Sequence, residues 1–215
     1  MVIRRPASRR DLTRTRQRII KAALREFAAK GFAGARTDAI VRRARVNKRM
    51  LFHCFGSKTK LYREILNHKL AQRAAVLEST PENLPAALAH WYEAAAADPD
   101  WIRFLHWEAS GNRRKPAAGQ VRRELFERAL ELFERWKRQG LLPPKTSGPE
   151  LLLSVVALAV FPVAFPQLVW LITGLWPEEE RFQHSWRKFL NAVAGQLESG
   201  PHRSADTRRA AADQI

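Results

Sequence analysis

The sequence predicts an all-α protein with a small basic domain ahead of a larger one, and three observations carry this prediction. From Thr13 onward, apolar residues recur at spacings of three and four, which is the repeat of a helix buried on one face. Beyond residue 80 no alternating pattern typical of a β-strand replaces that spacing. Residues 1–60 hold 18 Lys and Arg against 3 Asp and Glu, whereas residues 61–215 hold 20 against 18.

Composition narrows the class of protein further. A chain of 215 residues that is 46% apolar can bury a core, and its single cysteine excludes an internal disulfide framework. One cysteine also fits a reducing compartment, and the basic opening MVIRRPASRR is unlike a secretory leader. We therefore expect a cytoplasmic protein. Its concentrated positive charge attracts polyanions, nucleic acid first and an anionic membrane surface second.

The first sixty residues predict a disordered basic arm over residues 1–13 and then three helices. Gly31 ends the first helix, whose apolar stripe is Ile19, Ile20, Ala23, Leu24, Phe27 and Ala28. Thr37 is the expected N-cap of a short second helix, and Asn47 is the expected N-cap of the third. Ser57 then caps a long helix from about Lys58 to Glu78.

The second and third helices, joined by Ala44-Arg45-Val46-Asn47, meet the physical needs of a helix-turn-helix unit. Leu51 and Phe55 lie four apart and point to the core, which leaves other side chains of the third helix facing outward. These outward side chains are Lys48, Arg49, Phe52 and His53. Cations at the start of such a helix lie nearest to base edges and phosphates, and Lys58 adds a phosphate contact.

These residues resemble a known family. The run RTRQRIIKAALREFAAKGFAGARTDAIVRRARVNKRMLFHCFGSKTKLY resembles the N-terminal domain of TetR/AcrR-type transcriptional regulators. The matching positions are Phe27, Gly31, Phe32, Ile40, Ala44, Val46, Leu51, Phe55, Ser57, Lys58 and Leu61. The resemblance implies a homodimeric repressor that binds a near-palindromic operator and is released by a small effector.

The implied layout is a helix-turn-helix DNA-binding domain at 14–60, a helical effector-binding and dimerisation domain at 61–199, and a disordered tail at 200–215. The candidate DNA contacts are Arg36, Thr37, Asn47, Lys48, Arg49, Met50, Phe52, His53 and Lys58. Lys48 and Arg49 are the expected base contacts, with Met50 third through an apolar contact to a thymine methyl.

The sequence departs from the family pattern at several positions, Met50 and Cys54 among them. Arg45 stands where the family usually has Gly in a left-handed conformation, which costs roughly 1–2 kcal/mol if that geometry is kept. Phe52 replaces a Tyr, so a hydroxyl that would bind phosphate is lost while the apolar ring remains. His53 takes the second aromatic position and can still donate a hydrogen bond to phosphate.

The rest of the chain predicts a helical body. The uncharged stretch 151–176 is long enough to span a membrane, which leaves a membrane-associated protein as one alternative. Pro162 and Pro166 interrupt it and predict a kink, and an all-apolar helix is also typical of a buried dimer helix. We therefore expect no membrane partner and assign the stretch to the core and the dimer interface.

Two further sets of residues are predicted in this body. Aromatic residues from several helices are candidates for an apolar pocket that holds a small apolar or aromatic effector. The candidate ligand-binding residues are Trp91, Phe104, Trp107, Phe126, Phe133 and Phe165. The candidate dimer-interface residues are Phe161, Leu168, Trp186, Phe189, Leu190, Val193 and Leu197.

Motifs for other functions are missing from the sequence. There is no Gly-rich phosphate loop, His-Glu-x-x-His pair or Gly-x-Ser-x-Gly elbow, so an enzyme is not expected. The six scattered histidines and one cysteine give no metal-ligand spacing, and we expect neither a metal nor another cofactor. A nonspecific, nucleoid-type DNA-binding protein remains the other alternative. Such a protein needs only the concentrated positive charge of residues 1–60.

Overall fold

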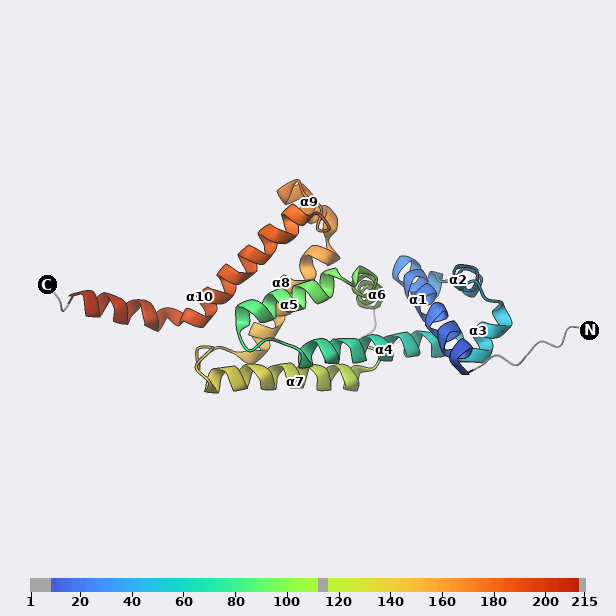
Figure 1. Cartoon of the computed structure of the whole chain (residues 1–215), viewed down its shortest axis with the longest axis horizontal. Coiled ribbons are helices and arrows are strands. Elements are labelled where there is room, and N and C mark those ends of the chain that lie inside the picture. Colours follow the sequence, from blue (N-terminus) through green and yellow to red (C-terminus); the bar gives the residue numbers. More distant parts are fainter. Residues whose placement is uncertain (1–8, 112–115, 213–215) are drawn as a thin grey trace, which may run out of the picture. The chain divides into compact units, whose positions relative to one another are not determined.

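The computed structural model describes residues 9–111 and 116–212, with side chains from 11 to 111 and from 116 to 198. Every regular element in these ranges is a helix, so the all-α prediction is confirmed (Figure 1). The first helices are α1 (Arg9–Gly34), α2 (Thr37–Ala44), α3 (Lys48–Phe55), α4 (Lys58–Glu78), α5 (Leu84–Ala96) and α6 (Pro99–Ser110). They are followed by α7 (Gly119–Arg138), α8 (Gly148–Ala164), α9 (Pro166–Thr173) and α10 (Glu180–Ala212).

The chain forms two compact units that are not contiguous in sequence. The first contains residues up to Arg73 and the segment Asp100–Gln120, and the second contains Ala74–Pro99 and the chain from Val121. The first unit thus extends beyond the domain boundary predicted at residue 60, because it includes most of α4 and nearly all of α6. It carries the candidate DNA-binding residues, and the second carries most of the body.

An aromatic cluster explains why α4 and α6 belong to the first unit. The Phe27 ring of α1 lies 5.4 Å from the Tyr62 ring of α4 and 6.4 Å from the Phe104 ring of α6, centroid to centroid. Tyr62 and Phe104 stack at 4.6 Å, and Trp101 stacks on Phe104 at 5.4 Å. Such ring pairs add stabilisation beyond the area that they bury. The cluster therefore holds together helices that are far apart in sequence.

Gly31 breaks α1, as the sequence predicts, although one more helical turn follows it as far as Gly34. Its φ of 66° and ψ of 179° lie in a region that only glycine adopts readily. A Cβ at this position would meet the Trp107 ring of α6 at 2.9 Å. The Trp107 indole N–H donates to the Ala28 carbonyl at 3.0 Å. Glycine at position 31 is thus required both by the backbone and by the close approach of Trp107.

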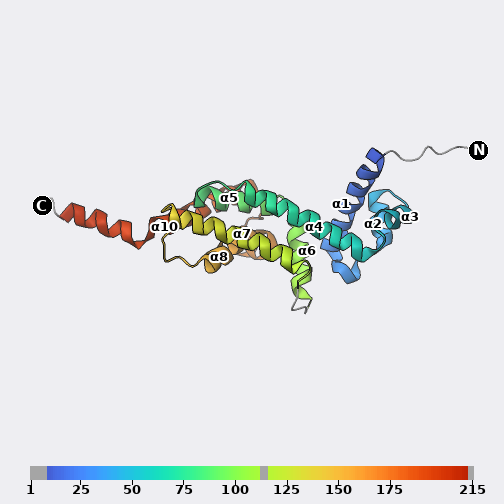
Figure 2. The ribbon, with the colours of Figure 1, turned by 90° about the horizontal axis from the view of Figure 1, so that it is seen from below.

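The second unit has its own core, in which α5 packs against α8 and α10 (Figure 2). Large side chains of α5 and α7 fill this core, and Tyr92, Phe133 and Trp136 are at most 1% exposed. The other buried members are Leu84, Ala87, Leu88, Leu132, Leu142, Leu151, Val155, Ala159, Leu190 and Ala194. α8, which forms the first half of the predicted apolar stretch, and α10, which follows the stretch, therefore both contribute to a buried core inside this unit.

The apolar stretch 151–176 is broken where the proline pattern predicts a kink. α8 ends at Ala164, Phe165 has a non-helical conformation, and Pro166 begins α9. The two helices are bent by 86°. Among the described residues no single helix is long and apolar enough to cross a membrane, although this bent pair meets that criterion by length and composition.

The ends of the chain correct two predictions. α1 begins at Arg9, so residues 9–13 are helical rather than part of a disordered arm, and residues 1–8 lie outside the described residues. α10 continues to Ala212, so the expected disorder is wrong for residues 200–212. This last segment is rich in Ala and Arg, which favour a helix, and it extends a helix already formed. Residues 213–215 lie outside the described residues.

Candidate DNA-binding site

The α2–turn–α3 unit is built around a left-handed residue at the end of α2. Arg45 has φ 53° and ψ 49°, as the departure from the family's Gly implies. The Arg45 N–H donates to the Arg42 carbonyl and the Val46 N–H to the Val41 carbonyl, at 3.2 and 3.1 Å. This pair of bonds is the Schellman motif, in which glycine usually occupies the left-handed position. Arg45 therefore keeps a strained conformation that costs roughly 1–2 kcal/mol.

Arg18 of α1 binds the carbonyl groups at the C-terminal end of α2. Its guanidinium donates from Nη2 to the Ala44 carbonyl and, at 2.9 Å, to the Arg45 carbonyl. The last carbonyls of a helix have no partner within the helix, and they form the negative end of its dipole. A cation at this end therefore stabilises both α2 and the turn that follows it.

Glu26 of α1 binds the opposite end of the same helix. It is only 2% exposed, and its carboxylate accepts the backbone N–H of Arg36 at 3.5 Å. The carboxylate also lies 3.5 Å from Arg43 Nη1 and 3.2 Å from Lys30 Nζ. Arg36, which makes no side-chain cap, is the N-cap residue, so the prediction of Thr37 as the cap is wrong. The acceptor comes instead from another helix.

The spacing of these two α1 residues matches the length of α2. Arg18 and Glu26 are eight positions apart, which is about 12 Å along a helix, and α2 is eight residues long. α1 and α2 are packed neighbours (Figure 1). Each charged side chain therefore reaches the end of α2 whose partial charge it complements.

α3 is capped at both ends. Asn47 Oδ1 accepts the Met50 N–H at 2.7 Å, which confirms the predicted N-cap. At the other end, Arg16 of α1 donates from Nη1 to the Cys54 carbonyl at 2.6 Å. The Arg16 guanidinium also lies 4.5 Å from the centroid of the Phe55 ring. α1 thus holds the C-terminal ends of both short helices with arginines.

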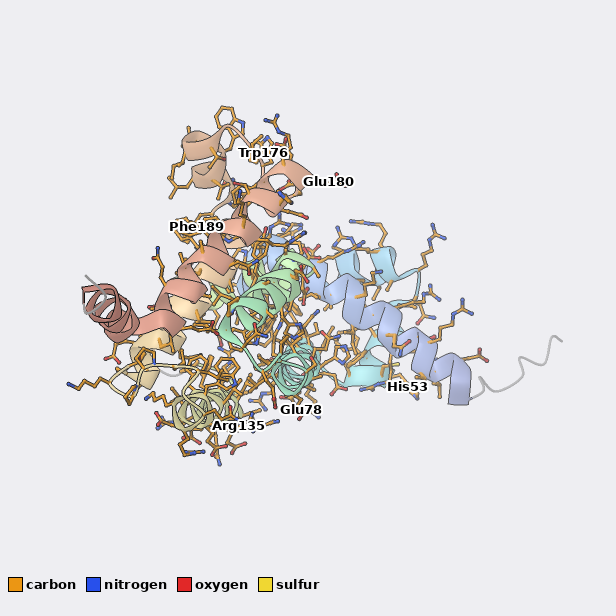
Figure 3. The ribbon with its side chains drawn as sticks, turned by 60° about the vertical axis from the view of Figure 1, so that its left-hand side comes forward. His53, Glu78, Arg135, Trp176, Glu180 and Phe189 are labelled. Atoms are coloured by element: carbon orange, nitrogen blue, oxygen red, sulfur yellow. The ribbon has the colours of Figure 1, made fainter. Side chains whose placement is uncertain are left out.

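The outer face of α3 carries the predicted side chains. Leu51 and Phe55 are buried, whereas Lys48, Arg49, Phe52 and His53 are exposed, and Figure 3 shows His53 on this helix. Lys48 Nζ lies 2.9 Å from Asp38 Oδ1 of α2, with 52% and 70% of the two side chains exposed. Lys48, a candidate base contact, is thus paired with a carboxylate. This ion pair would have to break before Lys48 could bind DNA.

Lys58 is positioned by an aromatic ring. Its ammonium group lies 4.8 Å from the centroid of the Phe32 ring, and Phe32 packs edge-on against Tyr62 at 5.2 Å. Ser57 Oγ accepts the Lys60 N–H at 3.1 Å, so the predicted cap of α4 is confirmed. Lys58 therefore begins α4 with its charge held over the aromatic cluster of the first unit.

Comparisons with known proteins agree with this geometry. A family model described as bacterial regulatory proteins of the tetR family matches residues 19–65. The HTH-type transcriptional repressor SCO4008 of Streptomyces coelicolor is 30% identical over 167 residues, which make up 77% of this chain and 86% of that protein. The chain belongs to the tetR family of bacterial regulatory proteins. As a TetR-family member it is a DNA-binding transcriptional regulator, and members of this family are transcription factors rather than enzymes.

Other similarities cover either the DNA-binding part or the fold. The HTH-type transcriptional repressor NicS of Pseudomonas putida is 46% identical over 55 residues, or 26% of each chain. The crystal structure of the candidate transcriptional regulator SCO4942 of Streptomyces coelicolor has a TM-score of 0.70 at 24% identity, covering 83% of this chain and 97% of that one. The hemolysin II transcriptional regulator HlyIIR has a TM-score of 0.55 at 18% identity, covering 84% and 98%. The last two similarities show the fold alone.

The structure of this TetR-family chain brings most of the predicted DNA contacts to the two short helices and their ends. Arg36 and Asn47 are exposed, and Thr37, Met50 and Lys58 are half-buried. The supporting residues Arg16, Arg18 and Glu26 are absent from the prediction. Their positions on α1 carry no local signal for this role, because their partners are ten or more residues away.

The six predicted ligand-binding residues are divided between the two units. Phe104 and Trp107 belong to the first unit, where they pack with α1, and the other four belong to the second. In the second unit Trp91 lies 6.1 Å from Phe133, centroid to centroid, whereas Phe126 and Phe165 are exposed.

The predicted interface residues fall into two groups. Phe161, Leu168, Phe189 and Leu197 are between 38% and 46% exposed, and Phe189 is seen on α10 in Figure 3. Leu190 is fully buried in the core of the second unit, so its assignment to the protomer surface is wrong. Trp186 and Val193 are half-buried, and the Trp186 indole N–H donates to the Leu158 carbonyl at 3.3 Å.

Replacement of Glu26 by Gln tests its support of α2. Gln can still accept the Arg36 N–H, but it loses the charge that is shared with Arg43 and Lys30. We expect a loss of about 1–2 kcal/mol in the free energy of unfolding, measured by chemical denaturation. Glu64→Gln is the matched control, because Glu64 forms a half-exposed ion pair with Arg16 at 2.8 Å and should lose less than about 1 kcal/mol. Equal losses would contradict the role of the buried carboxylate.

Replacement of Asp38 by Asn tests its hold on Lys48. Release of Lys48 should raise the affinity for random-sequence DNA and steepen its salt dependence, by up to about 0.9 in the logarithmic slope per protomer. Fluorescence anisotropy with a labelled duplex measures both quantities. Glu64→Gln makes the same change of charge without freeing a cation of α3. If that variant gains as much affinity as Asp38→Asn, the gain reflects net charge and not the release of Lys48.

Proposed function

We propose that the chain is a sequence-specific repressor that binds a near-palindromic operator as a homodimer. We further propose that a small apolar or aromatic effector, bound in the second unit, releases it from DNA. The sequence-level similarity supports repression, because both curated relatives are named transcriptional repressors.

The placement of cations on α3 is the observation that carries the DNA-binding part of the proposal. Lys48 and Arg49 occupy the first turn of α3, where the helix dipole favours acidic side chains and disfavours cations. Both side chains are exposed, so their position is not explained by packing. The N-terminal part of the second helix of a helix-turn-helix unit faces the base edges and phosphates of the major groove. There, phosphate charge would offset the unfavourable dipole.

Exposed apolar side chains support the homodimer. α8, α9 and α10 expose large apolar residues, among which Leu153, Leu171 and Ile172 are between 71% and 72% exposed. Exposed large apolar side chains in such number are typical of a protein interface. Two copies related by a twofold axis would present two α3 helices to half-sites about one helical turn of DNA apart, about 34 Å. A near-palindromic operator follows from that symmetry.

Two buried donors in the second unit support a polar acceptor on the effector. The Tyr92 hydroxyl and the Trp136 indole N–H are buried and have no hydrogen-bond partner among the described residues. Burial raises the pKa of Tyr92, against a smaller lowering effect of Arg187. The surroundings are aromatic, since the Trp91 ring lies 6.4 Å from that of Trp136. A bound aromatic compound with a hydrogen-bond acceptor would satisfy either of these groups.

Substitutions on α3 and α4 test how the DNA contacts divide. Lys48→Ala and Arg49→Ala should relax sequence preference and cost about 1–3 kcal/mol of operator binding if the side chains contact bases. Lys58→Ala should instead weaken binding to every duplex alike and lower the salt slope by about 1. Anisotropy titrations against the duplex upstream of the protein's own gene and against random DNA give both results. A uniform loss for all three variants would contradict this division of roles.

The same titration of the unsubstituted protein separates a repressor from a nonspecific, nucleoid-type binder. Binding that persists at about 0.2 M salt and in excess random DNA indicates a specific regulator. Sedimentation of the complex should then show an even number of chains on each duplex. Equal binding to every duplex that is lost as salt rises would favour the nonspecific alternative.

Tyr92→Phe tests the effector site. The free protein should keep its stability or gain up to about 1 kcal/mol, because a buried hydroxyl without a partner is removed. The substitution should also reduce the loss of stability at alkaline pH, since stability held below pH 10 is lost as pH rises through the raised pKa. Thermal shifts with aromatic ketones and the matching hydrocarbons should show a preference for ketones that this variant loses.

Tyr62→Phe, at the other tyrosine of the chain, is the matched control and should leave that preference intact. A panel in which no compound stabilises the unsubstituted protein would contradict the effector site.

A further inference from the structure

We propose that Arg45 contacts a phosphate of the DNA backbone, and that this contact explains why a strained arginine occupies the turn of the helix-turn-helix unit. The inference rests on the proposed binding of DNA and adds a contact outside the two short helices. Arg45 has a left-handed backbone conformation. Strained backbone at a non-glycine residue is characteristic of functional sites, where another requirement outweighs local stability.

The backbone of Arg45 does not require an arginine. Its N–H and carbonyl are bound by the Arg42 carbonyl and the Arg18 guanidinium, and a glycine would make both bonds without the strain. The turn is therefore closed by main-chain groups and by Arg18. What distinguishes Arg45 from glycine is only its side chain.

The side chain also has no role in packing. Arg45 is exposed, and its guanidinium has no hydrogen bond or ion pair with any residue that the structure describes. Its neighbours make this position less favourable still, because Arg42 and Arg43 precede it and Lys48 and Arg49 follow. Arg43 is paired with Glu26 and Lys48 with Asp38, which leaves no adjacent acid for Arg45. A polyanion is the partner that this concentration of charge favours.

The position of Arg45 suits a backbone contact rather than a base contact. It precedes the N-cap Asn47 by two residues, so its Cα lies within about 11 Å of that of Lys48, at three peptide links. Residues beside the entering end of the second helix flank the major groove, where phosphates are nearest. A guanidinium is suited to bidentate binding of phosphate.

Three substitutions at position 45 separate charge from strain. Arg45→Gly removes both, Arg45→Ala removes the charge and keeps the strain, and Arg45→Lys keeps both. Ala118→Gly is the matched control, because Ala118 has φ 52° and carries no charge, so it relieves strain without affecting a DNA contact. The measurements are the Tm and the affinity of each protein for the gene-upstream duplex and for a random duplex, titrated against salt.

We expect Arg45→Gly to increase the stability of the protein and to decrease its affinity for DNA. Arg45→Gly should raise the Tm by about 2–8 °C, which corresponds to relief of about 1–2 kcal/mol of strain. It should weaken binding to both duplexes by about eightfold per protomer at 0.1 M salt, and reduce the slope of log affinity against log salt by about 0.9. Arg45→Ala should show the same loss of binding at unchanged Tm. Arg45→Lys should keep the slope, and Ala118→Gly should raise the Tm alone.

Three results would overturn the inference. The first is a higher Tm for Arg45→Gly with affinity and slope unchanged, which would make the arginine merely tolerated. The second is a loss of binding in Arg45→Gly but not in Arg45→Ala, which would assign the effect to the flexibility of the turn. The third is a lower Tm for Arg45→Gly, which would give the side chain a structural role. Failure of the unsubstituted protein to bind either duplex would instead overturn the proposed function itself, and the inference with it.

Discussion

The binding of both ends of α2 by side chains of α1 is the constraint on which the DNA-binding site depends. Glu26 lies at the end of α2 where the helix dipole is positive, and Arg18 lies at the end where it is negative. An eight-residue helix is not stable alone in water, so α2 takes its direction from these contacts. Because only a short turn separates α2 from α3, fixing α2 also fixes where α3 begins. The buried carboxylate therefore helps to place the exposed face of α3, which it does not touch.

Departures from local stability rules are concentrated in one short segment of the DNA-binding unit. Arg45 is strained, and Lys48 and Arg49 lie at the wrong end of a helix dipole. The surrounding sequence follows the rules closely, with Asn47 and Ser57 as caps and Leu51 in the core. A stable frame that holds an unfavourable charged surface is what a site for a polyanion requires. The same segment contains the residues that match the TetR family. The strained and unfavourably placed residues therefore occur within the helix-turn-helix unit that is typical of the family.

Features of the fold encoded by neighbouring residues could be predicted from the sequence, and features that depend on distant contacts could not. The bounds of α4 and the caps at Asn47 and Ser57 follow from spacing and residue type alone. Thr37 does not cap α2 as the sequence predicts, because the acceptor at this end of α2 is supplied by Glu26 on another helix. For a similar reason, the sequence does not indicate that α6 belongs to the compact unit of α1–α3. Only the folded chain brings Phe104 onto Tyr62.

The first unit is assembled from two pieces of chain, and this limits how such a protein can evolve. The chain leaves that unit after Arg73, returns at Asp100 and leaves again after Gln120. A gene fusion or recombination event that transfers only the N-terminal segment would separate Phe27 from Phe104 and Gly31 from Trp107. Transfer of the DNA-binding part to another regulator would therefore have to include α6 together with the N-terminal helices. Substitution within the turn and α3, by contrast, leaves this two-piece unit intact, because Arg45, Lys48 and Arg49 are exposed.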